Sequence, residues 1–125
     1  MAEGTIARIP IKHRFLKGGQ GTFLLDTGAQ VNVIRRQALS PKAKIKHHRN
    51  IRLTGIGPGQ MITQGTVTIK AFGHQLRFHI LPDESPLTED GMLGAAFICR
   101  HKAKLHYDLK VMEILGRMFP FEMED

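Results

Sequence analysis

The sequence predicts an all-β, barrel-like domain. Short runs in which apolar and polar residues alternate recur along the chain, and turns rich in glycine and proline separate them. Strand patterns far outnumber helical ones, and nothing repeats internally. Because many short strands in one chain favour a sandwich or barrel, we expect a closed barrel with one short C-terminal helix. A chain of 125 residues suffices for a single domain. We expect that domain to span residues 1–125, with its core at about 5–115 and a tail at 116–125.

The first part of the chain is predicted to contain short strands joined by turns. The glycines of Lys17 to Gly21 indicate a turn, which makes a hairpin-like return plausible. One helical turn is expected at Arg35 to Leu39, where Ser40-Pro41 would end it. The basic segment 42–50 is expected to be a loop or an edge strand, since exposed lysines on a sheet edge block unwanted pairing. The strands of this part are expected at 5–10, 22–26 and 31–34.

A glycine-rich hairpin is predicted in the middle of the chain. Ile51 to Leu53 alternates cleanly, and the apolar residues between Met61 and Ile69 continue on the far side. Thr54 to Gln60 contains three glycines in five residues, which indicates a flexible tip. A phosphate-binding loop is the rival interpretation. It is not favoured, because no Gly-Lys-Ser/Thr follows and the flanking patterns are those of strands.

The last part of the chain begins with a strand at Gln75 to Leu81, whose apolar residues occupy alternate positions. Residues 82–90 are polar with two prolines and are expected to form a loop. Gly91 to Gly94 leads into a helix expected at Ala95 to His101. Two last strands are expected at 104–107 and 110–114, followed by the tail at 116–125, which has little pattern.

The chain is basic, with a formal net charge of +7 and a pI near 10.0. Such a charge is compatible with a nucleic-acid partner or with an acidic surface. The basic residues are scattered except for one cluster, which contains no aromatic residue that could stack on a base. A solvated basic loop is therefore favoured over a nucleic-acid site. The cluster consists of Lys42, Lys44, Lys46, His47, His48 and Arg49.

Cysteine, histidine and hydropathy patterns limit the other function classes. The single cysteine, Cys99, excludes a disulfide within the chain and suits a reducing, intracellular compartment. No run approaches the roughly 18 apolar residues of a membrane span, so no membrane partner is expected. Among the seven histidines only His47 and His48 are close, and no carboxylate or cysteine stands at ligand spacing. We expect no metal and no cofactor.

The most informative stretch is Phe23-Leu24-Leu25-Asp26-Thr27-Gly28-Ala29. Three apolar residues of a predicted buried strand run directly into Asp26, and Gly28 permits a sharp turn. A carboxylate at the end of a buried strand is costly unless it is hydrogen-bonded, paired or protonated. The alternative is an ordinary turn, because Asp, Thr and Gly are common turn residues.

Residues 24–29, two apolar residues followed by Asp-Thr-Gly-Ala, resemble the active-site motif of the retropepsin family, the homodimeric aspartic proteases of retroviruses and LTR retrotransposons. The glycine-rich hairpin at Leu53 to Gln60 and Met92-Leu93-Gly94 ahead of the last helix also resemble features of that family. The resemblance covers roughly residues 5–115. The stretch from His101 to Ile114 is most similar to the gypsy-type retrotransposon branch.

The resemblance implies a retropepsin-like closed barrel that forms half of a two-fold symmetric aspartic protease. The chain holds one Asp-Thr-Gly, and the chemistry needs two carboxylates, so the resemblance implies a homodimer. As in aspartic proteases generally, the two carboxylates share one proton. By resemblance, Asp26 is catalytic. The residues that support the site are Thr27, Gly28, Ala29, Leu93 and Gly94, and those of the substrate-binding flap are Gly55, Ile56, Gly57, Pro58 and Gly59.

Two residues of the motifs modify this expectation. Ala29 has no hydroxyl that could stabilise a carboxylate anion, so we expect a mildly acidic working pH. Pro58 departs from the commoner Gly-Ile-Gly-Gly flap tip, removes one backbone donor and stiffens the turn.

The sequence thus predicts an aspartic endopeptidase that cleaves extended peptides. The resemblance suggests its own polyprotein as substrate and the cytoplasm or a virus-like particle as location. An alternative is a catalytically inactive or domesticated module used for dimerisation or peptide binding, against which the intact Asp26-Thr27-Gly28 argues. A third interpretation is a basic nucleic-acid-binding barrel, whose binding would weaken steeply with salt.

Overall fold

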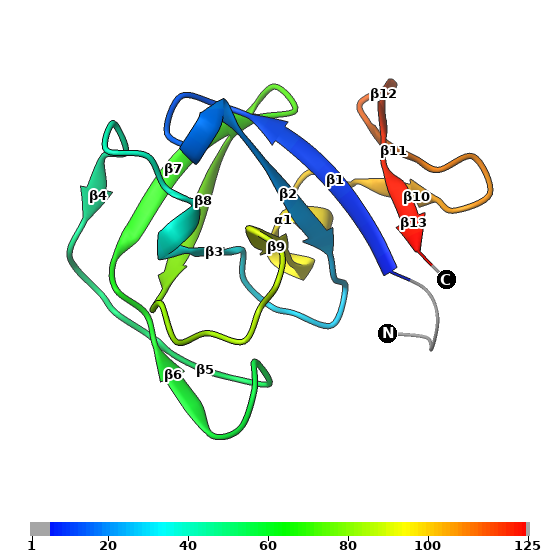
Figure 1. The fold of residues 1–125 in the computed structure, drawn as a ribbon. Coiled ribbons are helices and arrows are strands. Elements are labelled where there is room, and N and C mark those ends of the chain that lie inside the picture. The colour runs from blue at the N-terminus through cyan, green and yellow to red at the C-terminus, as the bar shows by residue number, and fades with distance from the viewer. Residues whose placement is uncertain (1–5, 125) are drawn as a thin grey trace.

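The computed structural model describes residues 6–124, so positions 1–5 and 125 of the predicted domain lie outside the described residues. Strands dominate it, and Figure 1 shows their arrangement. Two short 3-10 helices, η1 (Lys17–Gly19) and η2 (Arg36–Ala38), and the helix α1 (Ala95–Arg100) are the helical elements of the described residues. The strands are β1 (Ile6–Lys12), β2 (Gln20–Leu25), β3 (Val33–Arg35), β4 (Ile45–Lys46), β5 (Arg52–Thr54), β6 (Gln60–Ile62), β7 (Thr66–Ala71), β8 (His74–Leu81), β9 (Gly91–Leu93), β10 (Lys104–His106), β11 (Val111–Ile114), β12 (Arg117–Pro120) and β13 (Glu122–Glu124).

Eight strands form the main sheet in the order β13-β1-β2-β9-β3-β8-β7-β4. The pairing within residues 6–124 does not join β4 back to β13, so the sheet is open, and the predicted closed barrel is not confirmed. β4 is only two residues long and is followed by exposed basic residues. It therefore offers few backbone groups with which another strand could pair to close the sheet. The prediction of a loop or edge strand at 42–50 is confirmed, since β4 stands at the edge of the sheet.

The centre of the sheet places distant parts of the chain side by side. β9 lies between β2, with which it runs parallel, and β3, with which it runs antiparallel. All three residues of β9 are buried, which explains why the segment shows no alternation of apolar and polar residues. Gly91 is required there: a Cβ at this position would lie 2.3 Å from the Val33 carbonyl oxygen and 2.6 Å from the Phe23 ring.

The main core fills one side of this sheet and extends under α1. Phe23 and Phe78 are fully buried, and their ring centroids lie 5.3 Å apart in a tilted arrangement. A second, smaller cluster is built on Val33, Leu81 and Met92. Partly buried residues pack on the second cluster, and they include Leu53 and Ile56 of the glycine-rich hairpin. Apolar contacts with this second cluster therefore hold the hairpin against the main sheet.

The C-terminal residues 117–124 are ordered strands, where the sequence predicted a tail without pattern. β12 pairs with β11 in a small three-stranded sheet, and β13 adds to the main sheet alongside β1. Phe121 lies between them and is only 4% exposed. The pattern of β13, Glu-Met-Glu, has a single apolar residue. The sequence therefore lacks the alternation that would have indicated a strand.

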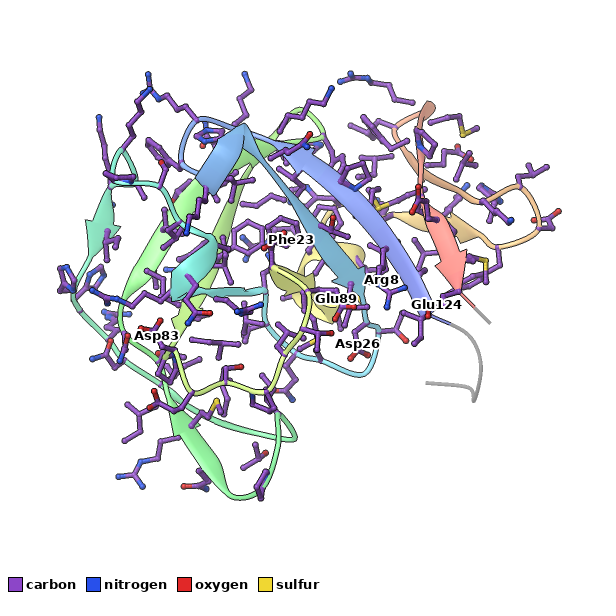
Figure 2. All side chains as sticks on the ribbon, in the orientation of Figure 1. Arg8, Phe23, Asp26, Asp83, Glu89 and Glu124 are labelled. Atoms are coloured by element: carbon purple, nitrogen blue, oxygen red, sulfur yellow. The ribbon has the colours of Figure 1, made fainter. Side chains whose placement is uncertain are left out.

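An ionic cluster links β1 and β13 to the loop that precedes β9. Figure 2 shows Arg8, Glu89 and Glu124 together at one end of β1. Arg8 Nε lies 2.8 Å from Glu89 Oε2, and Arg8 Nη1 also donates to Glu124. Burial of the Glu89 carboxyl raises its pKa. Hydrogen bonds from Arg8 and from the Thr88 hydroxyl outweigh that effect and hold the pKa below its ordinary value.

None of the helices among residues 6–124 has the length and apolar character needed to span a membrane.

Candidate active site

Asp26 stands where β2 ends and the chain turns. Its backbone N–H donates to the Leu93 carbonyl (3.0 Å), and its own carbonyl accepts the Ala29 N–H (3.2 Å). Its carboxylate oxygen Oδ1 accepts the Gly28 N–H at 2.9 Å. The side chain is half-buried and therefore remains accessible from one side. The hydrogen bond from the Gly28 N–H thus offsets the free-energy cost of placing the Asp26 carboxylate at the end of a buried strand.

The segment around Gly94 supports this turn from behind. Leu93 is fully buried in β9 and supplies the carbonyl that holds Asp26. A Cβ on Gly94 would lie 2.8 Å from the Ala29 carbonyl oxygen and 2.7 Å from that of Val31, so only glycine fits at this approach. The Ala95 N–H donates to the Ala29 carbonyl at 2.7 Å. Leu93 and Gly94, both predicted to support the site, therefore lie against the turn.

Asn32 is a supporting residue that the sequence analysis missed. Its side chain is buried, with 7% of the residue exposed. The amide oxygen Oδ1 accepts the Gly94 N–H at 3.0 Å, and Nδ2 donates to the Arg77 carbonyl at 3.2 Å. One side chain thus links the Asp26 turn to β8. No sequence pattern signals this link, because its partners are 45 and 62 residues away.

A cleft of about 620 Å³ opens between the Asp26 turn and the glycine-rich hairpin. Five predicted site residues line it: Asp26, Gly28 and Ala29 from the turn, and Gly55 and Ile56 from the hairpin. Asp26 is the acid and Arg52 the base among its lining residues. Thr27, Leu93, Gly94, Gly57, Pro58 and Gly59 do not line it. Lining residues that the prediction did not include are Gln30, Val31, Val33, Ile51, Arg52, Leu53, Thr54 and Met92.

The hairpin over the cleft consists of β5 and β6, paired antiparallel from Arg52↔Ile62 to Thr54↔Gln60. Gly55, Gly57 and Gly59 all have positive φ angles, which explains the three glycines at the tip. The tip leans on the loop before β9, since a Cβ on Gly57 would lie 2.8 Å from Pro86 Cγ. Pro58 faces a separate hollow of about 740 Å³, to which Met61 and Pro86 also contribute.

Within residues 6–124, no group of three or more histidine, cysteine or acidic side chains could hold a metal ion.

Comparisons with known proteins place this geometry in context. The family model described as retroviral aspartyl protease matches residues 6–106. The retroviral protease-like domain of Ddi1 from Leishmania major has a similar structure, with a TM-score of 0.58 and 13% identity over 98% of this chain and 95% of that one. A retropepsin-like aspartic protease from Rickettsia conorii matches with a TM-score of 0.43 and 20% identity over 98% and 99%. A comparison with curated proteins gives no match.

Proposed function

The chain belongs to the retroviral aspartyl protease family, and on that premise we propose that it is an aspartic endopeptidase that acts as a homodimer on extended peptides. The proposed catalytic residue is Asp26, and residues 1–125 are proposed to form one protease domain. The observation that supports this most directly is the position of Asp26. It is half-buried, hydrogen-bonded within its turn, and set at the wall of a cleft covered by a glycine-rich hairpin.

The number of carboxylates that line the cleft supports the proposed homodimer. Asp26 is the acid that lines it, and the chain has a single Asp-Thr-Gly. Hydrolysis of a peptide bond by a carboxylate pair needs a second acid at short distance. An isologous dimer supplies it, because a residue near the two-fold axis meets its own copy.

In the proposed dimer, the two Asp26 carboxylates share one proton, since two like charges at short distance cannot both ionise easily. The ionised carboxylate takes a proton from a water molecule held between the two acids. The protonated carboxylate polarises the scissile carbonyl and stabilises the tetrahedral intermediate. Proton return to the leaving amine completes the cleavage, so acid and base roles alternate within one pair.

The residues around Asp26 are proposed to fix its position and to accommodate the substrate. The Gly28 N–H holds Oδ1 and so orients the carboxylate. The hairpin acts as a flap, and backbone groups at Ile56 and Gly57 would hydrogen-bond an extended peptide by strand addition. Arg52 adds a positive charge to the cleft wall. Pro58 contributes no backbone donor to these contacts.

We also propose a substrate class and a cellular location. The family membership supports a retroviral-like polyprotein as substrate and an intracellular location, in the cytoplasm or a virus-like particle. The similarity to the gypsy-type branch stays a prediction from residues 101–114.

The experiment compares cleavage of a mixed peptide library by the wild type and Asp26→Asn between pH 4 and 7, with and without a statine-type transition-state mimic. The matched control is Asp83→Asn, which removes the same charge from an exposed position outside the cleft (Figure 2). We expect cleavage by the wild type and the control, inhibition by the mimic, and none by Asp26→Asn. Equal cleavage by Asp26→Asn would refute the assignment. A stable dimer that cleaves nothing would instead favour an inactive dimerisation or peptide-binding module.

A further inference from the structure

A second, smaller pocket is lined by residues of β8, of α1 and of the segment that follows the Asp26 turn. Its volume is about 100 Å³, roughly that of three water molecules. β8 contributes Arg77 and His79 to its wall, α1 and the residue after it contribute Arg100 and His101, and Asn32 lies between them. Among the residues that the structure describes, no acidic residue lines it. Four basic side chains therefore line a small pocket that is open to solvent.

The two arginines of this pocket are exposed, and their guanidinium groups carry its positive charge. None of the ion pairs formed within residues 6–124 includes Arg77 or Arg100. Burial lowers the pKa of His79, and the charge of Arg77 lowers it further. Burial also lowers the pKa of His101, with smaller contributions from His74 and Arg100. The lowered pKa values favour the neutral form of both histidines, so the positive charge at this pocket comes from Arg77 and Arg100, and a bound anion would favour protonation of the histidines.

One polar atom at the pocket has an unmet hydrogen-bonding requirement. His79 Nδ1 is buried and has no hydrogen-bond partner among the described residues. Native proteins rarely leave such an atom unpaired, because the missing hydrogen bond costs free energy. His79 belongs to the pocket wall, but its buried Nδ1 has no surface that a ligand in the pocket could reach without a change in the orientation of the ring.

We propose that the pocket formed by Arg77, His79, Arg100 and His101 binds a free oxyanion of the size of phosphate or sulfate. Arginine suits this ligand, because its planar guanidinium donates two parallel hydrogen bonds to neighbouring oxygens. The volume of about 100 Å³ is large enough for one such ion. The site does not depend on catalysis by Asp26.

The position of Asn32 connects this anion site to the Asp26 turn. Asn32 lines the pocket, its Nδ2 binds the Arg77 carbonyl, and its Oδ1 binds the Gly94 N–H. The backbone carbonyl of Asn32 also accepts the His79 N–H at 2.9 Å. A bound anion that fixes Arg77 and His79 would therefore stabilise the support of Gly94. We expect slower hydrogen exchange at the Gly94 amide when the site is filled.

The experiment titrates the intact wild-type protein with inorganic phosphate at constant ionic strength, adjusted with chloride. NMR follows the ring signals of His79 and His101 and the Gly94 amide. We expect saturable shifts that fit one phosphate per chain, a rise in the pKa of both histidines, and slower exchange at Gly94. Ring signals that stay unchanged by phosphate would overturn the proposal, and this reading needs no variant.

A pair of variants tests the location of the site. In the double variant Arg77→Gln/Arg100→Gln we expect phosphate binding to weaken at least about tenfold, since each lost charged hydrogen bond costs that much or more. The matched control is Lys70→Gln/Lys104→Gln, which removes the same charge from exposed positions outside the pocket and should bind phosphate like the wild type. Unchanged binding in the arginine variant, or an equal loss in the lysine control, would overturn the assignment.

Discussion

Replacing Asn32 by alanine should destabilise the protein by about 1.5–4.5 kcal/mol and loosen the Asp26 turn. The Gly94 N–H would lose its acceptor in a buried position, which costs about 1–3 kcal/mol. The Arg77 carbonyl would lose a donor in a partly buried position, which adds about 0.5–1.5 kcal/mol. Because small domains are stable by only about 5–15 kcal/mol, this loss is a large fraction of the total.

Urea unfolding followed by circular dichroism measures this loss, and peptide cleavage under conditions where the variant is folded measures the effect on the site. Asn50→Ala is the matched control, since Asn50 Oδ1 also accepts a glycine N–H, that of Gly65 at 2.7 Å, but Asn50 is exposed. We expect the control to lose about 1 kcal/mol. A loss below about 0.5 kcal/mol in Asn32→Ala, or equal losses in both variants, would refute the reasoning.

Three further predictions test other parts of the fold. Gly91→Ala should cost about 3 kcal/mol or more in urea unfolding, because its Cβ would lie 2.3 Å from the Val33 carbonyl oxygen in the centre of the sheet. Phe121→Ala should cost about 3–5 kcal/mol in the same assay, since the ring is only 4% exposed. Glu89 should make stability fall on acidification: its pKa is lowered in the folded state, so its contribution is present above the ordinary pKa of a glutamate and is lost as the pH falls through the folded value. The difference in urea midpoint between wild type and Glu89→Gln should therefore shrink from pH 6 to pH 3.

Each of these predictions has a contrary outcome. A Gly91→Ala variant as stable as the wild type would mean that β9 is not packed between β2 and β3 as described. Phe121→Ala should be compared with Met118→Ala, which is 55% exposed and should cost little. Equal effects of these two would contradict the packing of the C-terminal strands. A midpoint difference for Glu89→Gln that is independent of pH would contradict the lowered pKa.

The sequence predicted the elements whose residues alternate locally. The strand at Gln75 to Leu81 is observed as β8, and the helix at Ala95 to His101 is observed as α1. The glycine-rich hairpin is confirmed as β5 and β6, because its glycines and flanking strands are neighbours in the chain. For these elements, the pattern of neighbouring residues was sufficient for the prediction.

The elements that the sequence did not predict depend on distant contacts. β9 was expected only as an entrance to the helix. Its three residues form a strand because β2 and β3 flank it on both sides. β13 is polar and becomes a strand only by pairing with β1, more than a hundred residues earlier. The closed barrel is not confirmed for the same reason, since strand number and alternation do not determine whether the two edge strands of the sheet, β4 and β13, pair with each other.

In the candidate site, too, the local motif could be predicted from the sequence and the distant contacts could not. The Asp26 turn could be located from its motif, because the apolar run and the turn residues are contiguous. Asn32 could not, since its importance comes from partners on β8 and beside β9. The extent of the flap stays a prediction: Gly57 lies against the loop before β9, and Pro58 lines a separate hollow.

The central claim is that two copies of Asp26 act as one catalytic pair, and two chains joined in one polypeptide test it most directly. The three proteins to compare carry Asp26→Asn in neither half, in one half, or in both. We predict peptide cleavage by the first and none by the other two, because a single carboxylate cannot serve as both acid and base. Half the wild-type rate with one Asn would contradict the account, since it would show that each chain works alone.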